Sequence, residues 1–165
     1  MTAPRAYRPG VGAILLNAEG LVWVGRRTDV PGGAWQPPQG GIKAKEAPEA
    51  AVLRELKEEI GTDRAVIIAR ASAWLSYDLP EPIIARRWKG RYRGQNQCWF
   101  ALRFTGNESD IDVAAAKHAE FDAWRWVAIE ELPDLAVGFK RPVYERVVAE
   151  FRSLAVPSAA GSGTP

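Results

Sequence analysis

The chain has 165 residues, 47% of them hydrophobic, which suits one compact domain with its own core. Its 22 lysines and arginines nearly balance 20 aspartates and glutamates, so the chain is not polycationic and any nucleic-acid contact needs a local basic patch. No segment has the apolar length of a signal peptide or a membrane span, so we predict a cytoplasmic protein with no membrane partner.

The order of apolar runs and turn residues predicts a mixed α/β (α+β) domain. We expect two substantial helices, at about 46–60 and at 142–151, with Pro142 at a plausible start of the second. The strands are expected at 11–16, 21–25, 65–74, 97–104 and 123–128. The first two strands form a hairpin, and the Pro/Gly-rich segment AWQPPQGG leads into the first helix. This order suggests a sheet core with helices on both faces.

The chain shows no internal repeat and no second domain, so we predict a single domain over residues 1–155. Residues 156–165 include PSAAGSGTP, which lacks apolar periodicity, and we predict a disordered tail there. Cys98 is the only cysteine, which excludes an intrachain disulfide, and we expect its thiol to be buried and inert. His118 is the only histidine, which leaves no histidine metal cluster and no basis for a serine or cysteine triad.

Three glutamates share one face of the first predicted helix, because positions i, i+3 and i+4 are neighbours on a helix surface. These residues are Glu55, Glu58 and Glu59. The residues expected on the opposite, apolar face are Leu53, Leu56 and Ile60. Like charges this close are tolerable on the solvated face of an ordinary amphipathic helix, or useful where a divalent cation neutralises them.

The surroundings of these glutamates, GGIKAKEAPEAAVLRELKEEIGT, resemble the signature box of the Nudix hydrolases. Five residues separate Gly40 from Glu46, and seven more lead to the run REL that begins at Arg54. After one residue come the two further glutamates, then one residue and a glycine. The box ends in Thr62, where the family usually has an aliphatic residue. The resemblance implies the αβα sandwich of the Nudix fold with a mixed central sheet.

The resemblance also implies a metal-dependent hydrolase that uses Mg²⁺ or Mn²⁺. A pyrophosphate bond is flanked by oxyanions, which repel a nucleophile until metal ions neutralise them. The family assigns the metal to Glu55, Glu58, Glu59 and the carbonyl of Gly40, with Glu55 also a candidate for activating the water. For Gly40, a simple turn ahead of the helix is the alternative.

Two further charged positions and one outside the box complete the catalytic set that the family implies. Arg54 is expected to orient the carboxylates through charge-assisted hydrogen bonds. Glu46 is expected to pair with Arg54 or to interact with the helix N-terminus. Glu120, at the start of EFDAW, matches an additional catalytic and metal-binding glutamate of relatives, although an exposed loop glutamate is also common.

Stretches outside the box resemble bacterial RNA 5′-pyrophosphohydrolases and the related dinucleoside polyphosphate hydrolases. The resemblance runs from Tyr7 to Phe151 and rests on YRPGVG, WQPPQGG, WLSYDLP, GQNQCWF, EFDAWRWV and FKRPVYERVVAEF. It implies removal of pyrophosphate from 5′-triphosphorylated RNA, or cleavage of a dinucleoside polyphosphate such as diadenosine tetraphosphate, and it does not separate the two. The partner is then a nucleotide or an RNA 5′ end, with no DNA expected, and the sequence is silent on protein partners.

The same resemblance indicates residues that bind the substrate. Phe139 offers a ring for a base and Lys140 a cation for its phosphate, while Arg27 closes the opposite side and Val137 lies beside them. Core packing ahead of the last helix is the alternative for Phe139. Arg8 matches a phosphate-facing arginine of relatives, with a solvated arginine as the alternative, and Gln95 falls in the matching GQNQ stretch. Tyr77 lies where dinucleoside polyphosphate hydrolases carry a tyrosine, and an amphipathic residue at a strand edge is its alternative.

A basic and aromatic segment lies between Ile84 and Gln97, and we expect it to be a loop. It carries no acidic residue but contains Arg86, Arg87, Trp88, Lys89, Arg91, Tyr92 and Arg93. Such side chains bind polyphosphates by charge and bases by stacking, and a solvated basic loop is the alternative. Asn96 and Cys98 stand where the family pattern GQKQKWF has lysines, which weakens a phosphate-binding role at these two positions.

Two other classes of function compete with hydrolysis. A nucleotide- or RNA-sensing Nudix module would keep the fold but not the chemistry, and the intact arginine and glutamates of the box argue against it. A general nucleic-acid-binding module is disfavoured by the small net charge of +2 and by the acidic helix.

Overall fold

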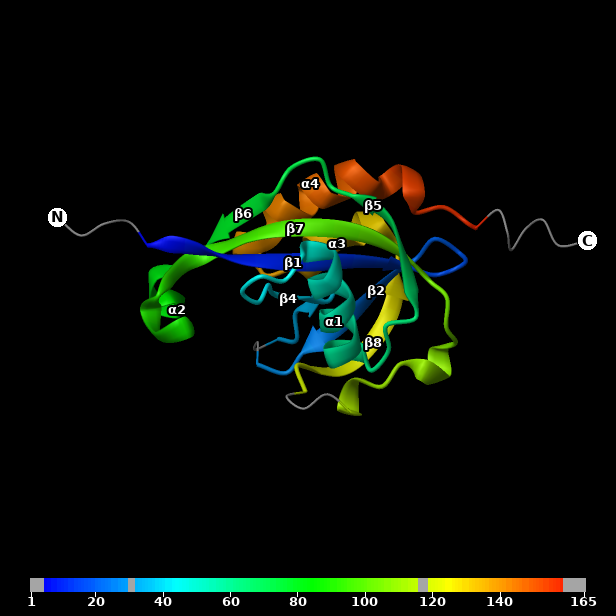
Figure 1. Cartoon of the computed structure of the whole chain (residues 1–165), viewed down its shortest axis with the longest axis horizontal. Coiled ribbons are helices and arrows are strands. Elements are labelled where there is room, and N and C mark those ends of the chain that lie inside the picture. Colours follow the sequence, from blue (N-terminus) through cyan, green and yellow to red (C-terminus); the bar gives the residue numbers. More distant parts are fainter. Residues whose placement is uncertain (1–4, 30–31, 116–118, 159–165) are drawn as a thin grey trace, which may run out of the picture.

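A mixed sheet lies at the centre of the molecule, between the helices α1 (Pro48–Ile60) and α4 (Arg141–Phe151) (Figure 1). The computed structural model describes the whole chain except residues 1–4, 30–31, 116–118 and 159–165. The strands are β1 (Ala6–Leu16), β2 (Val22–Arg27), β3 (Trp35–Gln36), β4 (Gln39–Gly41), β5 (Ala65–Arg70), β6 (Leu75–Asp78), β7 (Tyr92–Phe104) and β8 (Phe121–Val127). The shorter helices are α2 (Glu81–Ile84) and α3 (Leu132–Leu135), and the 3₁₀ turns are η1 (Trp88–Gly90), η2 (Glu108–Asp110), η3 (Val113–Ala115), η4 (Ile129–Glu131), η5 (Gly138–Lys140) and η6 (Arg152–Leu154).

The parallel pair β1 and β7 forms the middle of the sheet. These strands pair from Ala6↔Tyr92 to Leu16↔Arg103, and the order along the sheet is β3-β2-β1-β7-β5. The remaining strands attach off this path, with β4 on β1, β6 on β7 and β8 on β2, all antiparallel. The pairing of β4 with β1 places the first glycines of the box beside the middle of β1. The helix α1 begins shortly after β4 in the chain.

Alternate side chains of β1 enter two separate cores, because successive residues of a strand point to opposite faces. Ile14 and Leu16 join the core that contains the apolar side of α4. Val11, Ala13 and Leu15 join the core that contains the apolar side of α1. Since each face of the sheet is covered by a helix, the prediction of an αβα sandwich with a mixed sheet is confirmed.

Local sequence accounts for both ends of α1. Pro48 occupies the first turn, where its missing N–H has no intrahelical partner to lose. Gly61 ends the helix in the left-handed conformation (φ 86°) and donates its N–H to the Lys57 carbonyl. The buried residues of α1 are Ala51, Val52, Leu56, Glu59 and Ile60. Leu53 is only partly buried, and Glu59 lies on the buried side, so the expectation of one exposed acidic face is wrong for Glu59.

Several strand limits differ from the expected ones. The strand expected at 65–74 is two strands, β5 and β6, which pair with different parts of β7. β7 begins at Tyr92 because its polar first half pairs with β1 and β6, so the expected loop before Gln97 is shorter; it follows α2 and contains η1. The expected hairpin keeps one backbone pair, Leu16↔Val22, after which β1 and β2 diverge.

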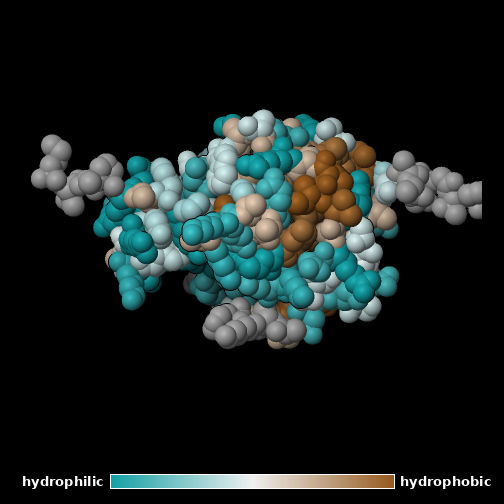
Figure 2. Space-filling view, in the orientation of Figure 1, coloured by the Kyte–Doolittle hydropathy of each residue, from teal (hydrophilic) through white to brown (hydrophobic). Residues whose placement is uncertain are grey.

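The surface and the ends of the described chain complete the fold. Figure 2 shows a largely hydrophilic face with one apolar area over β5, whose Val66 and Ile68 are 55% and 41% exposed. Cys98 is buried in β7 as predicted, and within the described ranges no helix is long and apolar enough to cross a membrane. The N–H of Ser158 donates to the Ala18 carbonyl at 2.7 Å. His118 and residues 159–165 lie outside the described residues, so the disordered tail and the domain limit at residue 155 stay predictions.

Candidate active site

Arg54, in the middle of α1, binds three glutamates at once. Its Nε and Nη2 donate to the two Glu46 oxygens at 2.7 and 2.8 Å, and its Nη1 donates to Glu55 Oε1 at 2.9 Å and to Glu58 Oε2 at 3.1 Å. Nη2 also donates to the Gly41 carbonyl at 2.8 Å, which ties α1 to β4. The hydrogen bonds from Arg54, together with the Lys43 backbone N–H, hold the pKa of Glu46 at about 2.

Glu59 lies buried beneath β4. The backbone N–H of Gln39 donates to Glu59 Oε2 at 3.1 Å, and the residue is 5% exposed. Burial, together with the charges of Glu120 and Glu55, raises the pKa of Glu59 well above 4.5. Burial also raises the pKa of Glu55, although Arg54 opposes this shift. Neighbouring negative charges therefore disfavour the ionised forms of Glu55 and Glu59, and a proton or a cation would relieve this.

Gly40 leaves the space that the Glu55 carboxyl group occupies. A Cβ atom added to Gly40 would lie 2.1 Å from Glu55 Cδ and 2.2 and 2.4 Å from its two oxygens. Real Cβ atoms do not approach other atoms this closely. The absence of a side chain at residue 40 is thus what allows the Glu55 carboxyl group to rest against the β4 backbone.

The chemistry of these donors fits a hard divalent cation. Carboxylates and a backbone carbonyl are the oxygen ligands that Mg²⁺ and Mn²⁺ prefer, and a cation would neutralise the repulsion among Glu55, Glu59 and Glu120. The side chains do not form a closed coordination shell, since the described residues contain no group of three acidic, cysteine or histidine side chains arranged for a metal ion. Glu58 is the most displaced, with its side chain 55% exposed and turned toward Arg54.

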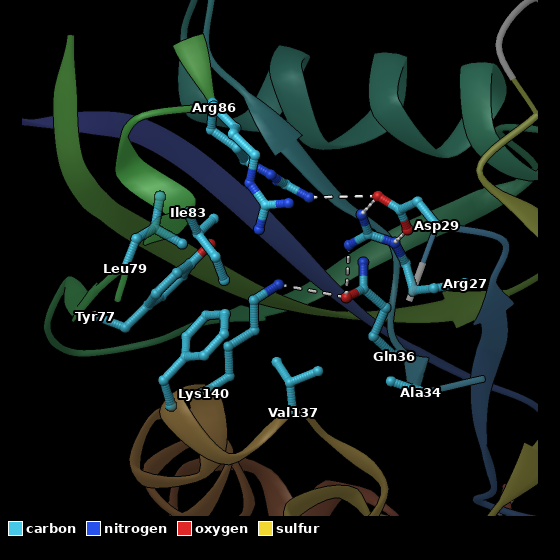
Figure 3. Close-up of a pocket in the computed structure, with 12 residues that line it drawn as sticks. Arg27, Asp29, Ala34, Gln36, Tyr77, Leu79, Ile83, Arg86, Val137 and Lys140 are labelled. Atoms are coloured by element: carbon cyan, nitrogen blue, oxygen red, sulfur yellow. Dashed lines mark hydrogen bonds and ion pairs between the residues drawn. The ribbon is translucent and has the colours of Figure 1, made fainter. Parts of the chain in front are cut away.

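Two connected cavities lie beside the carboxylates. The smaller, of about 230 Å³, has Gly40, Glu120 and Lys140 among its lining residues. The larger, of about 510 Å³, shares Arg27 and Lys140 with the smaller one (Figure 3). The walls of the larger cavity combine aromatic and aliphatic side chains with cations, namely Tyr77, Leu79, Ile83, Val137 and Phe139 with Arg27, Arg86, Arg87 and Lys140. Such a lining suits a flat ring attached to a phosphate.

Lys140 is a buried cation at the junction of the two cavities. Its Nζ donates to Gln36 Oε1 and to Gln39 Oε1, both at 3.3 Å, and lies 5.2 Å from the centre of the Tyr77 ring. Burial, together with the charges of Arg27 and Arg87, lowers the pKa of Lys140 to about 7. The charges of Glu120 and Glu59 partly oppose this shift, and an anionic group in the cavity would oppose it further.

A chain of buried amides extends from Lys140 into the sheet. Gln97 Nε2 donates to Gln39 Oε1 at 3.0 Å and to Gln95 Oε1 at 3.2 Å, and Gln97 Oε1 accepts from Trp99 Nε1 at 3.2 Å. Gln39 Nε2 in turn donates to the Tyr144 hydroxyl at 2.7 Å. Because buried amides are costly to leave unpaired, these bonds fix which oxygen atoms face Lys140.

Arg8 approaches the site from β1. Its guanidinium lies 5.1 Å from the centre of the Trp88 ring and against the Gly41 backbone, where an added Cβ would meet Nη2 at 2.3 Å. Trp88 and Lys89 both have a left-handed backbone, with φ of 48° and 57°, which is uncommon without glycine. This turn brings Trp88, with Arg87 5.8 Å from its ring centre, to the same cavity as Glu120.

Comparison with known proteins agrees with this geometry. The family model described as NUDIX domain matches residues 6–147, which is most of the chain. The chain belongs to the Nudix family. Nudix hydrolases use divalent metal ions, in keeping with the oxygen donors described above, and hydrolysis of a pyrophosphate bond is the chemistry of this enzyme.

Named relatives of this Nudix chain are similar over nearly their full length. The RNA pyrophosphohydrolase of Rhodospirillum rubrum is 57% identical over 93% of this chain and 92% of its own, and that of Gluconacetobacter diazotrophicus is 55% identical over 92% and 95%. Among solved structures, the E. coli dihydroneopterin triphosphate pyrophosphohydrolase is 19% identical with a TM-score of 0.65, covering 88% of this chain and 99% of its own. A C. elegans Ap4A hydrolase is 18% identical with a TM-score of 0.62, covering 88% and 98%. These two structures show the shared fold.

Most residues expected in the Nudix site come together. The predicted residues that line the smaller cavity are Arg8, Arg27, Gly40, Tyr77, Gln95, Glu120 and Lys140. Val137 and Phe139 line the larger cavity. The Phe139 ring lies 5.8 Å from the Tyr77 ring and also packs against the core on the α4 side, so its two expected roles are both compatible with its position. Glu46 pairs with Arg54, which is one of its two expected partners.

Three polar residues at the site are absent from the sequence-based prediction. Gln36 and Gln39 are 5% and 8% exposed and hold Lys140, and Asp29 pairs with Arg27. The sequence signal for the two glutamines is their position in AWQPPQGG, where one follows a tryptophan and the other precedes a glycine. Asp29 has no such signal, because its role depends on how the segment after β2 folds back.

Proposed function

We propose that this Nudix hydrolase removes pyrophosphate from the 5′ end of triphosphorylated RNA. The observation that carries the proposal is the pair of connected cavities, one bordered by Gly40 and Glu120 and the other large enough for a nucleobase. The names of relatives that are 49–57% identical, all RNA pyrophosphohydrolase, support the same substrate. The products are pyrophosphate and an RNA with a 5′ monophosphate.

In this proposal the carboxylates of α1 prepare the reaction. Mg²⁺ or Mn²⁺ would be held by Glu55, Glu58, Glu59, Glu120 and the Gly40 carbonyl. The ion would neutralise the charge of the polyphosphate and polarise the attacking water. Glu55 is a suitable base for the proton of that water, because burial raises its pKa toward the range useful near neutral pH.

Arg54 keeps these carboxylates in place. Its guanidinium contacts Glu46, Glu55 and Glu58 and the Gly41 carbonyl, so it fixes α1 relative to β4. This bridge links the backbone of β4 to the glutamates. We therefore assign Arg54 and Glu46 positioning roles, with no contact to the reacting atoms.

The cations and rings of the cavities would bind the rest of the substrate. Arg8 and Gln95 border the smaller cavity and are assigned to phosphates, with Lys140 at the junction. Arg27, Tyr77, Val137 and Phe139 border the larger cavity and are assigned to a base, which would stack on an aromatic ring. The same cavities could accept one half of a dinucleoside polyphosphate. Tyr77, which is 6% exposed, lies in their wall and matches the tyrosine of dinucleoside polyphosphate hydrolases, so this second substrate is tested as well.

The experiment is a comparison of kcat/KM with Mg²⁺ for triphosphorylated RNA, diadenosine tetraphosphate, an oxidised nucleoside triphosphate and ADP-ribose. We expect the highest value for RNA, with pyrophosphate as a product. Higher efficiency on diadenosine tetraphosphate would move the assignment to that substrate, and no turnover of any of the four would favour a sensing module. Conversion of 5′ triphosphates to monophosphates would place the enzyme in RNA decay, in the cytoplasm as the sequence predicts.

A further inference from the structure

The Nε–Nη2 edge of Arg27 is fully engaged by Asp29, and Nη1 also has a protein partner. Its Nε donates to Asp29 Oδ1 at 2.8 Å, its Nη2 donates to Asp29 Oδ2, and its Nη1 donates to Gln36 Oε1 at 3.2 Å. Each of the three guanidinium nitrogens therefore has one partner, which accounts for three of the five N–H groups. The Arg27 side chain is only 10% exposed, so little of it can turn to meet another acceptor.

Asp29 also cancels the charge of Arg27. Although burial works against the charged form, the hydrogen bond and charge of Arg27 lower the pKa of Asp29, so this carboxylate is ionised at neutral pH. A bidentate pair of this kind is the strongest geometry available to an arginine and a carboxylate. Asp29 additionally lies 3.4 Å from Arg87 Nη2, which joins the segment after β2 to the segment after α2.

With its Nε–Nη2 edge occupied, Arg27 offers a ligand its flat faces and one N–H on each of Nη1 and Nη2. Figure 3 shows Arg27 and Tyr77 on opposite sides of the larger cavity, with Lys140 and Val137 between them. A guanidinium whose edge is occupied binds a ring by stacking over its plane, whereas a guanidinium with a free edge binds a phosphate by two parallel hydrogen bonds. The two kinds of ligand therefore require different states of the same arginine.

We propose that Asp29 is a specificity-determining residue, which occupies the Nε–Nη2 edge of Arg27 and balances its charge, so that this arginine offers mainly its face and the larger cavity takes a nucleobase in place of a phosphate. This inference rests on the proposed function, in which the larger cavity is the site for a base. It assigns phosphate binding to the cations whose edges are less occupied. Arg86 is one of these, since its hydrogen bond in the described part of the chain is a long one, from Nε to the Pro82 carbonyl at 3.3 Å.

The test is Asp29→Ala, which frees the edge and the charge of Arg27. Inorganic pyrophosphate should then inhibit hydrolysis of triphosphorylated RNA about tenfold more strongly, the value of one added charge-assisted hydrogen bond. The KM for the RNA should rise at least about fivefold, because a mobile guanidinium stacks less well, while kcat stays near that of the wild type. Asp29→Asn keeps the size and one acceptor, so we expect changes in the same direction but smaller.

The matched control is Asp122→Ala. Asp122 forms the neighbouring pair with Arg26, at 2.7 Å, and neither residue lines the larger cavity. This variant should leave both the inhibition by pyrophosphate and the KM unchanged, and thermal melting should show that all three variants are folded. A purely structural role for Asp29 would weaken RNA and pyrophosphate together, and unchanged constants in both Asp29 variants would equally overturn the proposal.

Failure of the proposed function gives a different result. In that case the wild type itself does not hydrolyse triphosphorylated RNA. The comparison is then made by calorimetry with adenosine and with inorganic pyrophosphate as probes, since the edge of Arg27 affects their binding whatever the natural substrate is. Asp29→Ala should lower the affinity for adenosine and raise that for pyrophosphate, and any other pair of directions contradicts the role of Asp29.

Discussion

Gly40→Ala should displace the Glu55 carboxylate and leave the fold intact. The added Cβ would lie 2.1 Å from Glu55 Cδ, whereas ordinary contacts begin at 3.4 Å, so the carboxyl group must move by about 1.3 Å. A misplacement of about 1 Å in an active site can cost about 100-fold in rate. We therefore expect kcat to fall about 100-fold, which corresponds to about 2.7 kcal/mol of activation free energy.

The stability of the variant should change little. Gly40 is not among the described glycines with a left-handed backbone, so alanine is compatible with β4, and the displaced atoms are the end of a flexible side chain. We expect the free energy of unfolding to stay within about 0.5 kcal/mol of the wild type in urea denaturation. Gly138→Ala is the control, because no atom lies within 4 Å of its added Cβ.

A double variant checks the reason for the loss. In a Glu55→Ala background the methyl group of Gly40→Ala has no carboxylate to displace, so the second substitution should add little to the loss of activity. Steady-state kinetics of the two single variants and the double variant give the comparison. Full activity in Gly40→Ala, or losses that simply add in the double variant, would show that the close approach of residues 40 and 55 has no part in catalysis.

Three other outcomes are expected. Glu58→Gln and Glu59→Gln should keep the circular dichroism spectrum of the wild type and lose most activity. Chelation should abolish hydrolysis until Mg²⁺ or Mn²⁺ is returned. Near-normal turnover of both variants, or activity after thorough chelation, would contradict the metal site. Phe139→Ala should remove roughly 1–3 kcal/mol of stacking and raise KM for RNA more than it lowers kcat, and an early melting transition with unchanged KM would instead assign the ring to the core. Because Lys140 has a pKa of about 7 when folded and an ordinary value of 10.5, the unfolded chain binds more protons between these values. The free energy of unfolding should therefore rise with pH over this range, and Lys140→Met should flatten the rise in urea titrations.

Local patterns predicted the elements that carry the box, while long-range contacts decided how its residues are used. The periodicity of α1 and the turn at Gly61 are properties of neighbouring residues, so the helix could be predicted within two residues. The burial of Glu59 depends on the Gln39 backbone N–H, which comes from β4 and is invisible to a helical wheel. The wheel assigned Glu59 to the solvent for this reason.

The substrate side shows the same division. Family resemblance brought Arg27, Phe139 and Lys140 to attention, and the structure places all three at one cavity. The amide of Gln36, which accepts from both Arg27 and Lys140, could not be predicted, because its partners come from segments far apart in the sequence. Buried polar groups of this kind have no periodic signature, since each position is determined by the partner that satisfies it.

The parallel pairing of β1 with β7 has a consequence for how the chain acquires its shape during synthesis. The register Leu16↔Arg103 joins residues that leave the ribosome far apart in time, with about 90 residues, or roughly 5–18 s of translation, between them. Throughout this interval the apolar residues of β1 have been synthesised, whereas its long parallel partner β7 has not. Non-local pairing of this kind is slow. β2 and β4 can pair with parts of β1 early, but the edge of β1 that binds β7 stays open until β7 emerges, so this edge is exposed to wrong pairing during synthesis.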